Sequence, residues 1–452
     1  MNQNGSGGEI FGTCGGFYEK SAIFVGSGVN LRGGGIIEGL QQAATSQENE
    51  TQWISTTGGD LQSGVNWADG VALSQRTAGW KGILSFDGSQ TISNFYNENG
   101  TIIEVTGDGT VINATNVLMI GHTTAAHAIF SGNAVVSAGG LYLATTGSGT
   151  AGEQAGSTLT LKDNAVFNIR GNFVPGRNSA GTLYIQDNAV VNFNGGGVCV
   201  FGEFSDGAVC EMTGGEFNVN VASNASVYGN GLYLGRTSQF KQSGGTVTIG
   251  TSALELELRV GNNASYSLSD GVLNVSGILS KSASNFNFTG GVLSARTIQN
   301  GLTQDGGILS PGIDWTKSGE IALGTTTIQG DYALNDGSVR IEMTNDGWDV
   351  LEVTGKSTLA EGVLLDLVLA DDFLLQGGAS YAVWNSDGGF ALPENLENLL
   401  SPEVGYYWNL SQVGNSLVLS VDSAAVPEPG TWGMCVLGGM LLCLWRKFQK
   451  KG

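Results

Sequence analysis

Few residues in this chain have the types and spacing that could support catalysis or metal binding. His122 and His127 are the only histidines, and they lie five positions apart in a predicted loop. A metal site needs three or four ligands, so we interpret them as loop histidines without a function. Asp346 with Asp349, or the pair at residues 371–372, could act as a general acid and base. Their places at predicted turns and strand ends favour a structural role instead.

Three tyrosines form a candidate binding site. Tyr142, Tyr184 and Tyr233 lie in short alternating segments, at positions that point away from the predicted core. A row of aromatic rings could stack on sugars, and the alternative is that these are isolated exposed aromatics. Extracellular polysaccharide is therefore a candidate partner.

A repeat of short strands between about residues 131 and 311 would position the three tyrosines. Each unit has an apolar strand, a two-residue turn of Gly, Asp or Asn, and a second strand with an apolar–small–apolar pattern. The second strands are Phe167-Asn168-Ile169, Val191-Asn192-Phe193, Phe217-Asn218-Val219, Val247-Thr248-Ile249, Leu273-Asn274-Val275 and Leu293-Ser294-Ala295. Their central residues follow one another at intervals of 24, 26, 30, 26 and 20 residues. A strand-and-turn repeat of this length predicts a solenoid.

Two further patterns indicate three strands in each turn of the solenoid. In the strand before each two-residue turn, apolar and polar residues alternate, which sends one face of the strand to a shared core. A third strand recurs upstream: Leu141-Tyr142-Leu143, Val198-Cys199-Val200, Leu232-Tyr233-Leu234 and Leu258-Arg259-Val260. We therefore predict an all-β fold, a right-handed parallel β-helix. The recurrent Asn and Ser residues should stack between rungs in hydrogen-bonded ladders.

Composition limits the classes of function. The 452 residues include 73 glycines, only 13% are charged, and the formal net charge is −21. This charge repels phosphates, so nucleic acid is not an expected partner. No Asp-rich calcium loop is visible, and we expect no cofactor. The same alternation places Cys199 outward and Cys210 inward, so we expect no disulfide between them.

The chain divides into four predicted parts. Residues 1–50 are a low-complexity segment, and residues 51–311 form the β-helix repeat domain. Residues 312–423 form a C-terminal β module that caps the solenoid, because an uncovered rung would expose unpaired backbone groups. Residues 424–452 are a tail with a single transmembrane helix. We expect Trp67 and Trp80 to anchor the core of the first rung or cap, and residues 393–400 to be the only short helix of the body.

The tail has the most specific pattern. Pro427-Glu428-Pro429 begins an uncharged run that ends at Trp445, before Arg446 and Lys447. Residues 429–445 would span about 25 Å as a helix, somewhat less than the hydrocarbon core of a bilayer. Trp432 and Trp445 can lie at the two interfaces, and the basic residues should stay on the cytoplasmic side.

This three-part order resembles the PEP-CTERM sorting signal of Gram-negative bacteria. The resemblance implies that exosortase, a membrane transpeptidase, recognises Pro427, Glu428 and Pro429 and removes the tail. The protein would pass through the inner membrane and reach the cell surface or extracellular matrix. Such proteins also carry a signal peptide. None is visible here, so we expect the true start to lie upstream of Met1.

The repeats resemble autotransporter-associated β-strand repeats on a pectin-lyase-like β-helix, most clearly in residues 306–312 and at Gly330-Asp331-Tyr332. Together the patterns predict a non-enzymatic surface protein with a structural or adhesive role. Two alternatives stay open. A β-helix polysaccharide lyase or glycoside hydrolase would need acidic and basic groups clustered across neighbouring rungs. An autotransporter-like passenger adhesin would need a membrane barrel, and only one short helix is predicted after residue 423.

Overall fold

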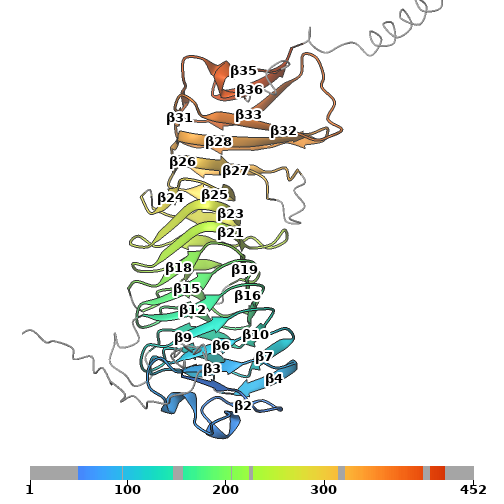
Figure 1. Cartoon of the computed structure of the whole chain (residues 1–452). Coiled ribbons are helices and arrows are strands. Elements are labelled where there is room, and N and C mark those ends of the chain that lie inside the picture. Colours follow the sequence, from blue (N-terminus) through green and yellow to red (C-terminus); the bar gives the residue numbers. More distant parts are fainter. Residues whose placement is uncertain are drawn as a thin grey trace, which may run out of the picture. The chain divides into compact units, whose positions relative to one another are not determined.

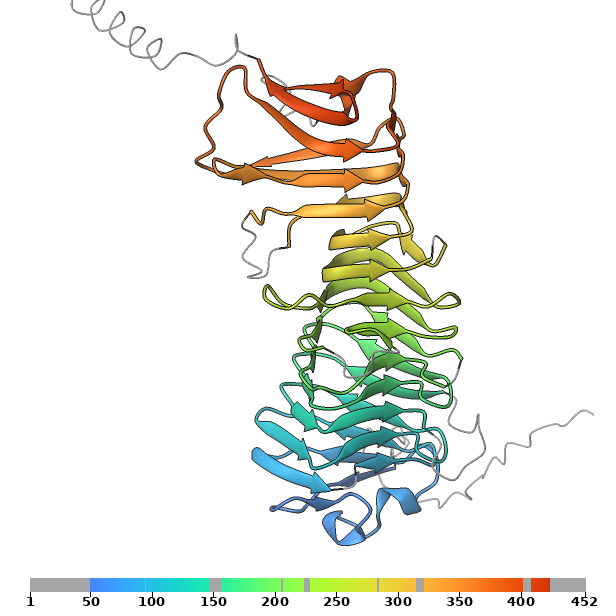
Figure 2. The same cartoon turned by 180° about the vertical axis from the view of Figure 1, so that it is seen from behind.

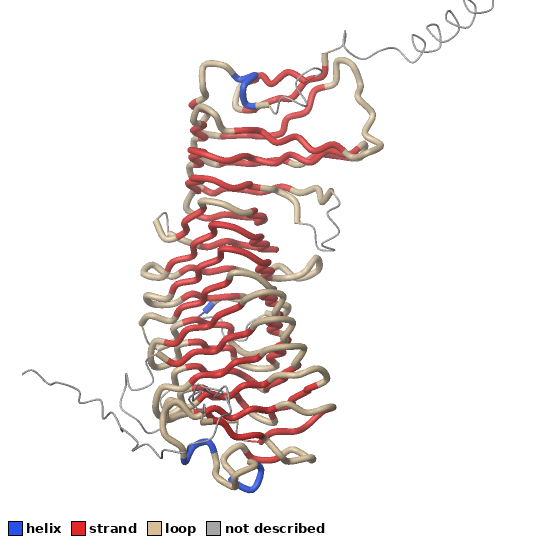
Figure 3. Tube along the Cα trace, viewed as in Figure 1, coloured by secondary structure: helices blue, strands red, loops and turns tan. Residues whose placement is uncertain are grey.

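The computed structural model describes residues 49–93, 95–145, 156–204, 206–222, 228–282, 284–313, 321–400 and 408–422. Regular structure in these residues is almost entirely β-strand (Figure 3), so the all-β class is confirmed. The helical turns among them are short and of the 3-10 type: η1 (Gly64–Asn66), η2 (Leu73–Gln75) and η4 (Leu396–Leu399).

Strands one repeat apart pair in parallel, and the pairs join into three ladders (Figure 1). The first ladder runs through β1 (Glu50–Gln52), β3 (Lys81–Leu84), β6 (Ile102–Val105), β9 (His127–Phe130), β12 (Ser157–Leu161), β15 (Gly181–Ile185), β18 (Val209–Met212), β21 (Gln239–Ile249), β23 (Ser265–Ser280), β24 (Phe286–Phe288), β26 (Leu302–Leu309), β28 (Tyr332–Thr344), β31 (Ser357–Leu359) and β34 (Phe390–Ala391).

The second and third ladders complete each rung. The second contains β2 (Gly59–Asp60), β4 (Gly88–Ser93), β7 (Thr110–Ala114), β10 (Val135–Ala138), β13 (Val166–Ile169), β16 (Val190–Phe193), β19 (Glu216–Val219), later parts of β21, β23, β26 and β28, the start of β25 (Val292–Gln299), and β32 (Leu364–Leu369). The third contains β5 (Tyr96–Asn97), β8 (Val117–Ile120), β11 (Gly140–Leu143), β14 (Phe173–Pro175), β17 (Cys199–Phe201), β20 (Leu232–Leu234), β22 (Leu258–Val260), the ends of β23 and β25, β27 (Thr325–Gln329), β30 (Val350–Val353) and β33 (Ser380–Ser386). The result is a parallel solenoid with three strands in most rungs.

The register of the second ladder confirms the predicted repeat residue by residue. The column of facing residues is Asn168, Asn192, Asn218, Thr248, Asn274 and Ser294. Within it, Asn192 Nδ2 donates to Asn168 Oδ1 at 3.0 Å, and Asn218 Nδ2 donates to Asn192 Oδ1 at 3.1 Å. Stacked amides of this kind link the three rungs that carry these asparagines. The ladder of bonds stops at Thr248, whose buried Oγ1 has no hydrogen-bond partner.

The opposite face of the second ladder forms the core. Its inward column is Phe167, Val191, Phe217, Val247 and Leu273, all fully buried and in register. Rings from the first ladder pack against it, as in the pair Phe217 and Phe240, whose centroids are 5.9 Å apart. A single rung could not bury these side chains, so the stack supplies the core jointly.

Glycines make the close corner between the first two ladders possible. Gly245 and Gly271 have φ values of +70° and +85°. A Cβ at Gly245 would lie 2.5 Å from the carbonyl oxygen of Gly215, and one at Gly271 would lie 2.4 Å from that of Gly245. Both the left-handed backbone and the narrow space between rungs therefore require glycine.

Two buried glutamines tie these corners to the core. Gln242 Nε2 donates to the carbonyls of Gly245 and Val272 at 3.1 and 2.9 Å, and the Tyr266 hydroxyl donates to Gln242 Oε1 at 2.6 Å. The same set recurs three rungs later, where the Tyr332 hydroxyl donates to Gln304 Oε1 at 2.6 Å. Buried polar groups need such partners, because an unpaired amide in the core costs free energy.

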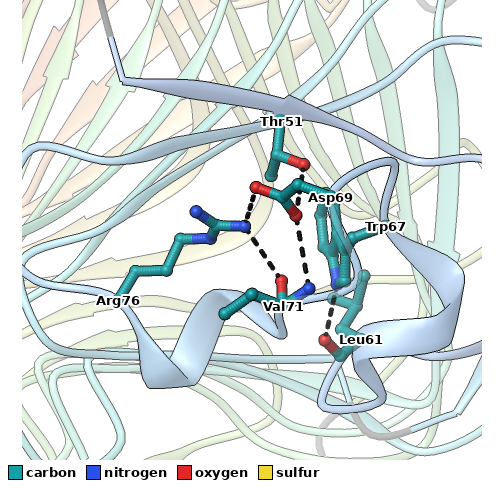
Figure 4. Close-up of polar contacts among 6 residues, drawn as sticks. All are labelled: Thr51, Leu61, Trp67, Asp69, Val71 and Arg76. Carbon is teal, nitrogen blue, oxygen red and sulfur yellow. Dashed lines mark hydrogen bonds and ion pairs between the residues drawn. The ribbon is translucent and has the colours of Figure 1, made fainter.

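Aromatic rings and a polar network cover the first rung. Trp67 is buried edge-on to Trp53, with ring centroids 5.3 Å apart, and its Nε1 donates to the Leu61 carbonyl. Beside it, Asp69 pairs with Arg76 and accepts bonds from Thr51 Oγ1 and the Val71 amide (Figure 4). Burial alone would raise the pKa of Asp69, but these partners outweigh it and hold the pKa below its usual value.

The two tryptophans expected to anchor this end have different roles. Trp67 is a core residue as predicted. Trp80 is half-buried beneath the guanidinium of Arg76, whose Cζ lies 4.0 Å from the ring centroid, so the prediction that it anchors the core is wrong. The 3-10 turns η1 and η2 also lie here, which corrects the expectation of a single helical turn near residues 393–400.

At the C-terminal end, parallel pairing crosses the boundary predicted at residue 311. It continues through β28, β30 and β31 to β33 and β34 (Figure 2). The covering element is narrower than a whole module. It is the antiparallel hairpin of β35 (Trp408–Val413) and β36 (Ser416–Val421), joined to β33. Its buried leucines, with Leu399 of η4, close the core.

Candidate functional site

The third ladder departs from the predicted register. Cys199 lies opposite Leu232, and Val200 lies opposite Tyr233, one position out of step with the expected alignment. Cys199 therefore points into the core, and the prediction that it faces outward is wrong. The physical reason is that its neighbours Val198 and Val200 are also buried, on the other side of the sheet, so no polar residue marks the phase.

The two cysteines of the solenoid do not form a disulfide, as predicted. Cys199 and Cys210 are both buried free thiols. Burial raises the pKa of each thiol, so neither is a ready nucleophile.

A second apolar cluster lies on the outward face of this ladder, which we call the outer cluster. Val174, Val198 and Val200 form its base, with exposures of 0%, 8% and 0%. The residues packed on the valines are Tyr142, Tyr228 and Tyr233. Outward valines on a strand are normally exposed to solvent, and here the tyrosine rings pack over them.

Charged groups frame the outer cluster. The Arg177 guanidinium lies over the Tyr142 ring at 4.4 Å and pairs with Glu203 at 3.3 Å. Glu203 also accepts a bond from the Tyr228 hydroxyl at 3.3 Å. Burial and the nearby Glu203 charge raise the pKa of Tyr228, so its hydroxyl stays protonated and donates.

The predicted row of three tyrosines is not one row. Tyr142 and Tyr233 lie on the outward face of the third ladder, but Tyr184 lies on the first ladder, opposite Glu211. Tyr228 takes its place, because its ring stacks on that of Tyr233 with centroids 5.6 Å apart. Periodicity missed Tyr228 because it precedes the strand rather than belonging to it.

The histidines do not form a pair. His122 stacks on Tyr96, with ring centroids 5.4 Å apart. His127 begins β9, which corrects its predicted place in a loop, and its Nδ1 shares a hydrogen bond with Thr158 Oγ1 at 2.9 Å. Burial lowers the pKa of His127. Among the described residues, no group of three His, Cys, Asp or Glu side chains could hold a metal ion.

The candidate acid–base aspartates differ in their exposure to solvent. Asp346 is exposed at the tip of the hairpin of β28 and β29 (Gly347–Trp348), and residues 371–372 are exposed in a turn. Asp349 is fully buried, and its carboxylate accepts the backbone amides of Gly324 and Glu342 at 2.7 and 3.0 Å. Burial raises the pKa of Asp349 to about 7, and the Glu342 charge adds to the rise while the two amides oppose it.

The sorting motif Pro427, Glu428 and Pro429 lies outside the described residues, as do Trp432, Trp445, Arg446 and Lys447. In the part of the chain that is described, no helix has the length and apolar character to cross a membrane.

Comparison with protein-family models, with characterised proteins and with solved structures finds no match for this chain.

Proposed function

We propose that the chain is an exported, non-enzymatic protein of the cell surface or extracellular matrix, in which a rigid solenoid has a structural and adhesive role. One observation carries the proposal. Parallel pairing runs without a break from β1 to β34, and side chains cover the core at both ends. A stack whose ends are closed does not recruit further strands, so it holds its length and presents fixed outer faces.

We further propose that the solenoid winds in the right-handed sense, as a β-helix. The support is general: a strand, a crossover and a parallel strand in one sheet are almost always connected with a right-handed turn.

Export and sorting rest on the tail. Proline lacks an amide donor and restricts its predecessor, so Pro427-Glu428-Pro429 should stay extended and accessible beside the membrane. The uncharged run up to Trp445 would hold the chain in the bilayer, and Arg446 with Lys447 would fix its orientation. Exosortase is the proposed partner, and the membrane is a transient one.

The test is made in a host that contains exosortase, with a working signal peptide added before Met1. The protein should reach the cell surface without residues 431–452, as read by mass spectrometry of surface extracts. Glu428→Ala should leave the tail attached and the protein in the membrane fraction. The matched control is Glu394→Ala, an exposed acidic residue of the body, which should be processed normally. If the protein extracted from the cell surface still ends at Gly452, the sorting proposal is wrong.

A further inference from the structure

A polar pocket opens where the third ladder turns toward the first, beside β22 and β23. Its volume is about 260 Å³. The side chains that matter for its chemistry are Tyr233, Arg259, Asn262, Ser280, Lys281 and Asn300. They come from four consecutive rungs, so the stacking of the solenoid assembles the pocket.

Lys281 is the unusual member of this set. It is 4% exposed, and its Nζ donates to the Gly301 carbonyl at 2.6 Å. Its backbone carbonyl accepts a bond from Asn300 Nδ2 at 2.6 Å, which fixes the turn around it. An ammonium group has three donors. The Gly301 carbonyl takes one, and no carboxylate of the described residues forms an ion pair with it.

Burying a cation without a counter-ion costs free energy, and the pKa of Lys281 reflects this cost. Burial lowers its pKa from 10.5 to about 8, so the ammonium form still dominates at neutral pH. A bound anion would offset the desolvation of this charge and raise the pKa again.

The charge near the pocket is opposite to that of the whole protein. The chain has a formal net charge of −21, yet Arg259 lies one rung below Ser280, beside Lys281. The Arg259 guanidinium also lies over the Tyr233 ring, with Cζ 5.6 Å from its centroid. Glu255 and Glu257 precede Arg259 on the same side of the chain, and neither lines the pocket. Two basic residues, Arg259 and Lys281, line one cavity in an acidic protein, and this favours an anionic ligand.

The remaining lining groups are suited to hydroxyls. Asn262 and Asn300 supply amides, Ser280 supplies a hydroxyl, and Tyr233 supplies a ring. One rung further, Asn285 Nδ2 donates a hydrogen bond to the carbonyl of Gly261 at 2.7 Å. The buried Oδ1 of Asn285 has no hydrogen-bond partner. Such a mixture of amides, hydroxyls and an aromatic wall recognises a sugar ring better than it recognises a bare ion.

We propose that this pocket binds the carboxylate of an acidic sugar, so that the solenoid holds a uronate-containing polysaccharide against its third ladder. Lys281 and Arg259 bind the carboxylate, the amides and Ser280 bind ring hydroxyls, and Tyr233 packs against the sugar. The outer cluster, with Arg177 above Tyr142, lies farther along the same ladder and provides a surface for neighbouring sugars. This assignment gives a ligand class to the adhesive role proposed above and rests on it.

The experiment measures binding of the full-length chain to three probes by isothermal titration calorimetry. Trigalacturonate carries carboxylates, maltotriose is a neutral trisaccharide, and dextran sulfate carries sulfate in place of carboxylate. Trigalacturonate should bind, maltotriose should not, and trigalacturonate binding should weaken as salt rises. Removing one charged partner with Lys281→Met or Arg259→Gln should weaken trigalacturonate binding by about tenfold or more.

The matched control is Lys241→Met, which removes an exposed lysine of the first ladder that pairs with Glu211. Its affinity for trigalacturonate should equal that of the parent. If Lys281→Met does not fold, the exposed Arg259→Gln decides the outcome. Equal affinity of Arg259→Gln and the parent would overturn the proposal, as would equal binding of maltotriose or binding of dextran sulfate alone. Sorting is measured in cells and binding on purified protein, so failure of one proposal is distinct from failure of the other.

Discussion

The second and third ladders belong to the same rungs but have opposite outward faces. The outward column of the second ladder repeats asparagine, threonine and serine without a charge: Asn168, Asn192, Asn218, Thr248, Asn274 and Ser294. The outward residues of the third ladder change from rung to rung: Met119, Tyr142, Val174, Val200, Tyr233, Arg259 and Ser280. The first column repeats one type of residue, and its three asparagines at 168, 192 and 218 share one repeated hydrogen bond; the second column repeats neither.

This difference separates side chains that bind the neighbouring rungs of the solenoid from side chains that could bind another molecule. Identical amides stacked between neighbouring strands satisfy one another, so a repeated column stabilises the stack itself. A column in which Tyr233 is followed by Arg259 cannot form such a ladder. Its valines are covered by tyrosine rings, and its one cation, Arg259, lines a pocket together with Lys281. We infer that the second ladder is built for stacking and the third for contact with a ligand.

The largest expected effect comes from breaking the core behind the second ladder. Phe217→Asp would place an unpaired carboxylate in the fully buried inward column and remove a ring that packs on Phe240. We expect a loss of about 4 kcal/mol or more in the free energy of unfolding. Urea denaturation followed by circular dichroism measures it.

The matched control puts the same charge one residue along, on the outward face. Asn218→Asp removes the bonds to Asn192 and Glu216 and places a carboxylate near that of Glu216. The position is only half-buried, so the cost should still be smaller than that of a charge in the core. Equal midpoints for Phe217→Asp and the parent would contradict the inward assignment.

The second prediction concerns Asp349, whose buried carboxyl precedes β30 of the third ladder. Its pKa is raised from 3.8 to about 7, so protonation favours the folded state. Its contribution is complete below about pH 4 and is lost as the pH rises through about 7. A shift of three pKa units corresponds to at most about 4 kcal/mol.

The comparison is with Asp349→Asn, which isolates the contribution of this one carboxyl. The free energy of unfolding of the parent, minus that of the variant, should fall between pH 4 and pH 8 in urea titrations. Glu342 is the charged neighbour that contributes to the rise, and Glu342→Gln should shift the fall to lower pH. A difference that stays flat across this range would rule out a titrating Asp349.

The sequence predicts the second ladder better than the third. Polar residues alternate with apolar ones in the second ladder, so the repeat located Asn192 and Phe217 on the correct faces. Around Cys199 both faces of the strand are buried. Apolar and polar residues do not alternate there, so the sequence does not show which side chains face the core. Tyr228 and Lys281 lie in corners between strands, where neighbouring rungs decide the contacts and periodicity says nothing. The closing hairpin was predictable from its own turn, whereas the continuation of parallel pairing past residue 311 was not, because the repeat spacing changes there.

A smaller effect should follow from breaking the asparagine column itself. Asn192→Ala removes the bonds to Asn168 and Asn218, both partly buried, and should cost about 1–2 kcal/mol. Asn168→Ala removes a bond shared with Asn192, so the double variant should cost less than the sum of the two. Strict additivity in chemical denaturation would show that the amides do not form a coupled ladder.

The smallest effect on stability should come from the third ladder's outward face. Arg259 is exposed, and its contact with Tyr233 is long, at 5.6 Å. Exposed charged contacts contribute little, so Arg259→Gln should change the free energy of unfolding by no more than about 0.5 kcal/mol. The same variant should lose trigalacturonate binding, because Arg259 lines the pocket and the substitution removes its charge. A variant that keeps its stability and loses its ligand would separate the two ladders as proposed. A cost matching that of Asn192→Ala, with binding intact, would instead make the third ladder a stacking face like the second.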